Sequence, residues 1–157
     1  MISPVQILLV EDNPADAELI RGILEESKVL MDVSTARNGV EAMEFLRADG
    51  NSTRERRPDL ILLDLNLPKR GGLDVLTSIK ADATLRFIPV VILTSSDSEA
   101  DVLNSYDLGA NCYVTKPVGF GAFREIIHAV ESFWFSTARL PAGSFGDRAR
   151  SATGGKR

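Results

Sequence analysis

The sequence predicts an α/β protein with a parallel β-sheet that is covered by helices on both faces. Strand-like apolar runs alternate with segments of helical period, and five such pairs follow one another along the chain. The strands are too apolar to alternate between a buried and a solvated side, which is typical of parallel sheets buried on both faces. With 157 residues, the chain is long enough for one domain with a sizeable core.

The first two strand–helix pairs are marked by apolar runs and capping signals. The run VQILLV at 5–10 is followed by Asn-Pro at 13–14, a capping side chain and a proline suited to a first helical turn. A second strand is predicted at 31–36, and a helix is expected within NGVEAMEFLRADG at 38–50.

The other three pairs follow the same pattern. LILLD at 60–64 is the strongest predicted strand, LDVLTSIK is the helix after it, and PVVILT and NCYVT are the last two strands. A helix is predicted from 99 to 108, with these side chains facing the core: Val102, Leu103 and Tyr106. The last predicted helix is FGAFREIIHAVESFWF at 120–135.

Composition limits the domain organisation and the partners. The predicted domain spans 1–140, and 141–157 has little to bury and is expected to be disordered. The formal net charge of −4 gives no general attraction to nucleic acid, and no apolar run is long enough to span a membrane. The single cysteine, Cys112, and the lack of a secretory leader predict a cytoplasmic protein.

Polar residues stand at the carboxyl ends of four of the five predicted strands. In order along the chain they are Glu11 and Asp12, Asp64, Thr94 and Ser95, and Lys116 with Pro117. Ligands of open parallel sheets bind beyond these ends, where the strand order reverses. Each group has an ordinary explanation, because an acidic pair often begins a helix and a Lys-Pro step often forms a turn. The functional prediction therefore depends on their conjunction.

Three carboxylates and a lysine in one place favour a cation and phosphoryl chemistry. Neighbouring carboxylates repel one another, so the cluster attracts a cation, and its hard oxygen ligands favour Mg²⁺ over zinc. The cation and the lysine would neutralise phosphoryl oxygens while a carboxylate attacks phosphorus in line. Asp64 is the predicted nucleophile, because its strand lies between the acidic pair and Lys116.

In order and spacing, these residues resemble the receiver domain of two-component response regulators, and the resemblance covers about residues 4 to 135. It implies the flavodoxin-like, doubly wound sheet with strand order 2-1-3-4-5. The segments EDNPAD and FWFSTARLP more narrowly resemble small regulators paired with phytochromes, so a phytochrome-type sensor histidine kinase is an expected partner.

The resemblance also implies roles for the acidic residues. Asp64 would accept a phosphoryl group from a phosphohistidine of the kinase. Asp12 would bind Mg²⁺ directly and Glu11 through water, and the backbone carbonyl of Asn66 would add a ligand. The chain would then be a phosphoacceptor that assists its own phosphorylation and dephosphorylation, and not an enzyme. Asn66 and Ser95 are expected to tune the lifetime of the phosphorylated form.

Further roles follow from the same resemblance. Lys116 would contact the acyl phosphate, and Pro117 would follow a cis peptide bond. Thr94 would move to hydrogen-bond the phosphate, and the ring of Tyr113 would turn inward with it. The alternative for Tyr113 is a half-buried strand aromatic with no further role.

Phosphorylation would shift the protein toward a second conformation, read out on the fourth helix, fifth strand and fifth helix. Phe133, Trp134 and Phe135 cannot all face inward, because consecutive helical positions are about 100° apart. We therefore expect a homodimer or kinase contact there. Only about twenty residues follow this helix, too few for an output domain of ~50 residues or more, so a stand-alone receiver is expected.

Three other protein classes fit less well. A haloacid-dehalogenase-type phosphatase needs a second acid two residues after the nucleophile, where this chain has Asn66. A flavin-binding protein would need a glycine- and hydroxyl-rich phosphate loop where the chain has the acidic EDNPAD. A receiver that serves only as a scaffold would lack one of the acids or the lysine, and none is missing.

Overall fold

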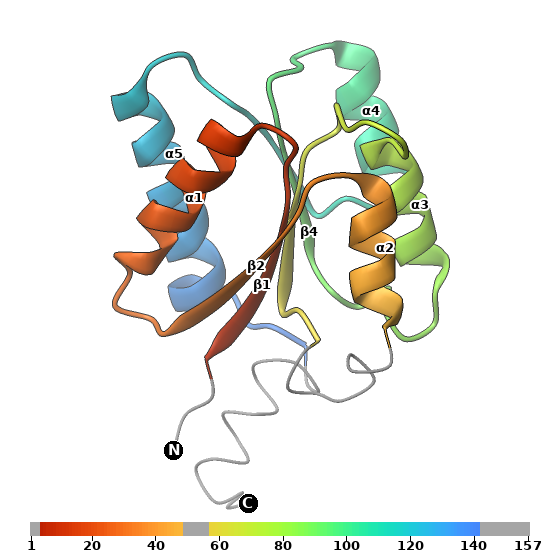
Figure 1. Cartoon of the computed structure of the whole chain (residues 1–157), viewed down its shortest axis with the longest axis horizontal. Coiled ribbons are helices and arrows are strands. Elements are labelled where there is room, and N and C mark those ends of the chain that lie inside the picture. Colours follow the sequence, from red (N-terminus) through yellow and green to blue (C-terminus); the bar gives the residue numbers. More distant parts are fainter. Residues whose placement is uncertain (1–3, 49–56, 142–157) are drawn as a thin grey trace, which may run out of the picture.

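The computed structural model describes residues 4–48 and 57–141, and within them five strands form one parallel sheet (Figure 1). The strands are β1 (Val5–Val10), β2 (Met31–Ala36), β3 (Leu60–Leu63), β4 (Val90–Thr94) and β5 (Cys112–Thr115). Their order across the sheet is β2-β1-β3-β4-β5, and every neighbouring pair is parallel. The predicted fold class and strand order are confirmed.

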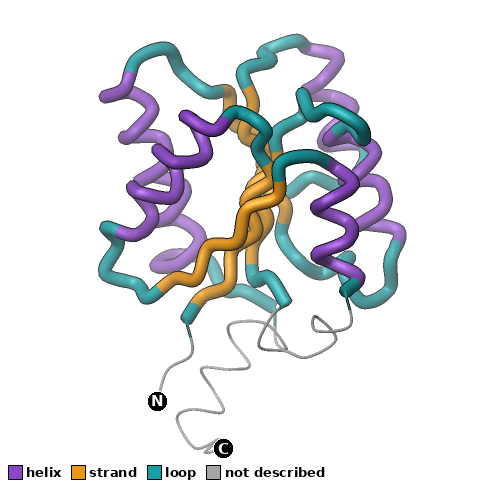
Figure 2. The backbone as a smooth tube through the Cα atoms, in the orientation of Figure 1, coloured by secondary structure: helices purple, strands orange, loops and turns teal. Residues whose placement is uncertain are grey.

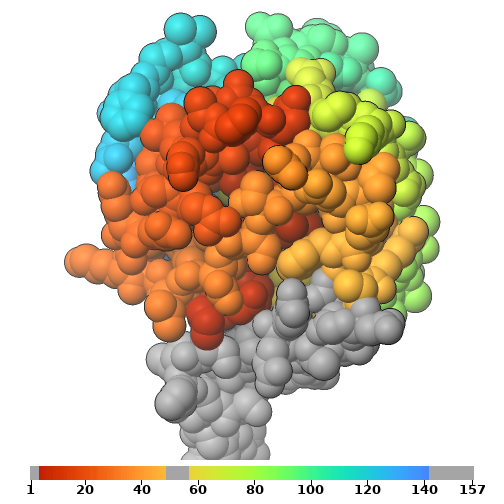
Figure 3. Space-filling view, in the orientation of Figure 1, coloured from red at the N-terminus to blue at the C-terminus, as the bar shows by residue number. Residues whose placement is uncertain are grey.

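Helices cover both faces of this sheet, which lies between them in Figure 2. They are α1 (Pro14–Glu25), α2 (Gly39–Arg47), α3 (Gly72–Ala81), α4 (Glu99–Asp107) and α5 (Phe120–Ser132), followed by a π-helical segment, η2 (Phe133–Thr137). Figure 1 shows α1 and α5 on one face and the other three helices on the opposite face. α1 and α5 also lie side by side on the surface in Figure 3, and they pack against each other.

The central strands are buried on both faces, which explains their nearly continuous apolar sequence. Every residue of β3 and β4 is buried. Ile61 and Leu63 belong to the core under α2 and α3, whereas Leu60 and Leu62 belong to the core under α1 and α5. Burying such a side chain contributes roughly 1.5–3 kcal/mol to the stability of the fold. The central strands therefore hold the residues at their carboxyl ends in fixed positions.

Capping side chains begin three of the helices. Asn13, Asn38 and Ser98 each accept a backbone N–H from the first turn of α1, α2 and α4, at 3.0, 2.9 and 3.1 Å respectively. Losing such a cap typically costs ~1 kcal/mol. Because α1 begins at Pro14, directly after the end of β1, its first turn lies next to the carboxyl ends of the strands.

Two helix predictions need correction. Leu103 and Tyr106 are 66% and 50% exposed, so they do not face the core, and the buried residue of α4 is Ser105. α4 has only nine residues and a weakly apolar composition, so periodicity was a poor guide to its buried side. The last α-helix ends at Ser132, and the three aromatic residues after it begin η2.

None of the helices in residues 4–48 and 57–141 is both long and apolar enough to cross a bilayer. Of the predicted tail at 141–157, everything after 141 lies outside the described residues, so the domain boundary stays a prediction.

Candidate functional site

The ends of β1 and β3 bring the acidic residues together. Val10 and Leu63 are register partners, so Glu11 and Asp64, which follow them, are neighbours across the sheet. Their carboxylates and that of Asp12 offer ligand atoms that all lie within 4.8 Å of one another. Glu11 and Asp64 are buried, whereas Asp12 is exposed to solvent.

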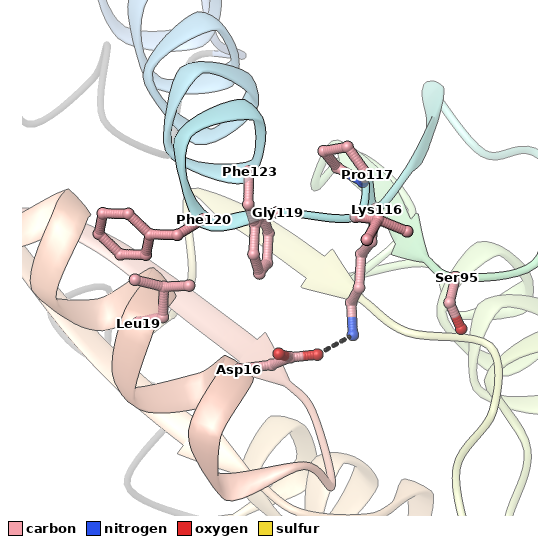
Figure 4. Close-up of a pocket in the computed structure, with 9 residues that line it drawn as sticks. Asp16, Leu19, Ser95, Lys116, Pro117, Gly119, Phe120 and Phe123 are labelled. Carbon is pink, nitrogen blue, oxygen red and sulfur yellow. Dashed lines mark hydrogen bonds and ion pairs between the residues drawn. The ribbon is translucent and has the colours of Figure 1, made fainter.

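Lys116 joins this cluster from the end of β5. Its Nζ lies 2.7 Å from Glu11, 2.9 Å from Asp16 and 3.2 Å from Asp64, and its side chain is only 9% exposed. Figure 4 shows Lys116 and Asp16 pointing toward each other from opposite sides of the site. An ammonium group has three N–H donors, so three carboxylates occupy all of them.

Burial and neighbouring charges shift the pKa values of Glu11 and Lys116. Burial raises the pKa of Glu11 to about 7, which the hydrogen bond from Lys116 partly opposes and the charge of Asp64 reinforces. Burial lowers the pKa of Lys116, but hydrogen bonds to Glu11 and Asp16 and the charge of Asp64 outweigh it, so the pKa lies above its ordinary value. Lys116 therefore stays positively charged, and the carboxylates around it outnumber it.

The backbone after β3 holds Asp64 in place. The amide N–H of Asn66 donates to Asp64 Oδ1 at 3.2 Å, and the N–H of Asp64 donates to the carbonyl of Val10 at 3.1 Å. Gly72, at the start of α3, lies so close that a Cβ there would be 2.3 Å from the Asp64 carbonyl oxygen. Only glycine allows this approach, which keeps the loop after Asp64 compact.

Thr94 and Tyr113 belong to one hydrogen-bond network. The fully buried Thr94 hydroxyl accepts from Asn66 Nδ2 at 3.5 Å and from the N–H of Ser96 at 3.4 Å. Ser96 in turn donates from its hydroxyl to Asp101 of α4 at 2.6 Å, and its carbonyl accepts from the Tyr113 hydroxyl at 2.8 Å. Ser96 thus connects the end of β4 with α4 and β5.

Sequence reasoning missed two of these residues. Neither Asp16, in the first turn of α1, nor Ser96, in the loop after β4, was assigned a role from the sequence. A signal for Asp16 was present, because a helix that begins directly after β1 turns its first residues toward the strand ends. Ser96 carried no comparable signal, since its partners are set by the packing of α4 and β5.

The predicted cis peptide bond before Pro117 is wrong. The described residues, Lys116–Pro117 included, contain no cis peptide bond. Trans is the lower-energy form even before proline, by about 0.5–1 kcal/mol. Lys116 reaches all three carboxylates with the bond in the trans form.

The three aromatic residues that follow α5 lie in η2, apart from the carboxylate cluster. Phe133 is 51% exposed, and its ring meets that of Trp134 edge to face with centroids 5.3 Å apart. Trp134 and Phe135 pack against the core under α1 and α5. One of the three therefore faces outward.

The carboxylate cluster fits a divalent cation. All of its side-chain ligands are hard oxygens, and the exposed position of Asp12 leaves room for the waters that a small divalent ion keeps. The buried negative charge would be partly neutralised by such an ion. The carbonyl of Asn66 as a further ligand stays a prediction.

Comparisons with known proteins agree with this geometry. The response regulator receiver domain family matches residues 7–129. The response regulator Rcp1 of Synechocystis sp. is 45% identical over 139 residues, which are 88% of this chain and 95% of that protein.

Two solved structures are also similar over 88% of this chain, each with a TM-score of 0.83. One is the phosphorylated cyanobacterial phytochrome response regulator RcpA, with 49% identity and 99% of that chain covered. The other is the Mn²⁺-bound form of Rcp1, with 45% identity and 100% of that chain covered.

Proposed function

We propose, from the premise that this chain belongs to the response regulator receiver family of phosphorelay signalling, that Asp64 accepts a phosphoryl group from a sensor histidine kinase. The observation that carries the proposal is the position of the Asp64 carboxylate, 3.2 Å from Lys116 Nζ and in one cluster with Glu11 and Asp12. A buried carboxylate next to a lysine and a cation site has the partners that phosphoryl transfer needs.

The transfer would be an in-line displacement at phosphorus. A carboxylate oxygen of Asp64 forms the new P–O bond while the P–N bond of a phosphohistidine breaks, and the histidine nitrogen keeps the electron pair. Lys116 is positioned to donate to the phosphoryl oxygens. A divalent cation held by Glu11, Asp12 and Asp64 would supply further charge neutralisation. We propose Mg²⁺ as this ion, and the Mn²⁺-bound structure of a relative supports a divalent cation in general.

The chain would act as a phosphoacceptor that assists its own phosphorylation and dephosphorylation, because the groups required lie on the same chain. Asn66 is well placed for the second reaction, since its side chain reaches Thr94 and its N–H reaches Asp64. The expected cytoplasmic location, suggested by a single cysteine, belongs to the same proposal.

The switch would begin at Thr94. A phosphoryl group offers new acceptor oxygens, so the Thr94 hydroxyl can exchange its present neighbours for the phosphate. The N–H of Ser96 would then lose its acceptor, and Ser96 also contacts Asp101 and Tyr113. Movement at Thr94 would thereby reach α4 and β5, which together with α5 form the proposed readout surface.

The input is proposed to be a kinase of the phytochrome type. Support comes from the solved relatives, one of which is described as a cyanobacterial phytochrome response regulator. Phosphotransfer from a phytochrome histidine kinase should therefore exceed transfer from an unrelated kinase. Equal rates from both would remove this part of the proposal.

A homodimer through η2 is the proposed assembly. Phe133 exposes an aromatic ring beside Trp134, an arrangement that a second copy of the chain could cover. Sedimentation analysis should find a dimer that Phe133→Ser weakens. Phe87→Ser is the matched control, because Phe87 is 58% exposed elsewhere on the surface. Dimerisation that is unaffected by Phe133→Ser would contradict this interface.

The central experiment is incubation with acetyl phosphate and Mg²⁺, followed by mass measurement of the intact protein and its peptides. Wild type should gain one phosphoryl group on Asp64, and Asp64→Asn should gain none. Asp32→Asn, the same change at an exposed position of β2, is the control and should behave as wild type. Phosphate on another residue, or none on wild type, would overturn the proposal.

A further inference from the structure

Asp16 lies on the lysine side of the site and does not belong to its cation-binding side. Its Oδ2 is 2.9 Å from Lys116 Nζ, closer than the 3.2 Å that separates Nζ from Asp64. The group of carboxylates with ligand atoms within 4.8 Å of one another does not include Asp16. Asp16 therefore acts on the lysine and leaves the cation to the other acids.

The position of Asp16 is fixed by its backbone, while its carboxylate stays in contact with solvent. Its N–H donates to the capping Asn13 side chain at 3.0 Å, which holds the first turn of α1. Its side chain is 29% exposed, against 2% for Glu11 and 6% for Asp64. A carboxylate that water can reach is released from an ion pair at lower cost than a buried one.

Phosphorylation changes what Lys116 must bind. All three of its N–H donors are taken by carboxylates, and a phosphoryl group on Asp64 would bring new acceptor oxygens to the same place. To donate to the phosphoryl group, Lys116 must release one present partner. Asp16 is the partner that solvent can stabilise after release.

We infer that Asp16 is a positioning residue that competes with the incoming phosphoryl group for Lys116 and so slows phosphorylation of Asp64. The inference rests on the proposed function of Asp64. Asp16 and Lys116 both line a pocket next to α1 and the start of α5, shown in Figure 4, so a negatively charged donor that approaches Lys116 there also meets the Asp16 charge. Both effects oppose the transfer.

A purely structural role would leave a different signature. An acid in the first turn of α1 interacts favourably with the helix dipole and, if that were its only role, would affect only the stability of the fold. Asp16→Asn separates the two roles, because it keeps the size of the side chain and one acceptor oxygen while it removes the charge. Asp16→Ala removes the acceptor as well.

The test measures phosphorylation rates at saturating Mg²⁺ with two donors, acetyl phosphate, which is a dianion, and phosphoramidate, which carries one negative charge. Asp16→Asn should be phosphorylated about five- to tenfold faster than wild type by acetyl phosphate and about two- to threefold faster by phosphoramidate, because repulsion scales with donor charge. Asp16→Ala should likewise show a larger rate increase with acetyl phosphate than with phosphoramidate. Glu18→Gln, an exposed acid on the same helix, should match wild type.

Equal or lower rates for both Asp16 variants would overturn the inference. An increase of the same factor with both donors would support the competition for Lys116 and contradict the repulsion of the donor. Neither result would affect the proposed function, because that function is tested by phosphorylation of Asp64 in the wild-type protein. If wild type gained no phosphate on Asp64, the proposed function would fail and this inference with it. The two failures are therefore distinguishable in one series of reactions.

Discussion

Two lysines at opposite ends of the sheet each donate to three acceptors, but the acceptors of one are charged and those of the other are neutral. At the carboxyl ends of the strands, Lys116 Nζ contacts three carboxylates at 2.7–3.2 Å. At the amino ends, Lys80 Nζ donates to the carbonyls of Arg86 and Ile88 and to Asn111 Oδ1, each at 3.2 Å. Burial lowers the pKa of Lys80, whereas the carboxylates keep that of Lys116 above its ordinary value.

The comparison shows that the same residue type has neutral partners at one end of the sheet and charged partners at the other. The three acceptors of Lys80 are neutral oxygens, so no negative charge accumulates around it. Asn111 also accepts from the N–H of Val90 at 2.8 Å, and these hydrogen bonds connect α3 with the amino ends of β4 and β5. Around Lys116 the acids outnumber the cation. A metal ion can neutralise that excess of negative charge, and under the proposed function Lys116 would exchange one of its carboxylate partners for a phosphoryl group.

Removal of Lys116 should have the largest effect. Lys116→Met leaves Glu11 and Asp64 buried without a cation, so metal-free protein should lose about 3 kcal/mol of unfolding free energy in urea titrations. Phosphorylation by acetyl phosphate should fall about 100-fold, because one charge-stabilising donor is lost. Saturating Mg²⁺ should restore part of the stability but not the rate.

The comparison between the lysines would be wrong if Lys116→Met and Lys80→Met had the same effect on phosphorylation. Circular dichroism of both variants, measured beside wild type, would show whether each is folded under the assay conditions.

The stability of the protein should depend on pH because the pKa of Glu11, at the carboxyl end of β1, is raised in the folded state. The folded chain holds a proton on Glu11 up to a pKa of about 7, whereas the unfolded chain loses it near the ordinary value of 4.5. Metal-free protein should therefore lose stability as the pH rises from about 5 to 7, by up to ~3 kcal/mol, and then level off.

Urea titrations with a chelator across this pH range measure the effect. Glu11→Gln removes the titrating group, so its stability should be nearly flat over the same range. A wild-type protein whose stability rises from pH 5 to 7, or a Glu11→Gln protein with an unchanged slope, would contradict the assignment.

Removal of Lys80 should have the smallest effect, and it should be confined to stability. Lys80→Met leaves three neutral acceptors without their donor and should cost about 1–2 kcal/mol of unfolding free energy. Phosphorylation rate and Mg²⁺ affinity should match wild type, since Lys80 contacts none of the site residues. A changed phosphorylation rate would show that the two ends of the sheet are coupled.

Particular residues show how far sequence reasoning could reach. The strand at 60–64 and the acidic pair at 11–12 could be identified from the sequence, because an apolar run and the chemistry of a side chain are local properties. The facing of Leu103 and Tyr106 was predicted wrongly, because a short helix with few apolar residues does not specify its buried side by period. The cis bond before Pro117, inferred from resemblance, was wrong as well.

The order of residues along this chain was enough to determine a parallel α/β sheet and to place acids, a hydroxyl and a lysine at its strand ends. Only the folded chain decided that Asp16 would share Lys116 with Glu11 and Asp64, across a sequence separation of 100 residues. The physical reason is that periodicity reports which way a residue faces on its own element. Which distant residues come to share a hydrogen bond depends on how those elements pack.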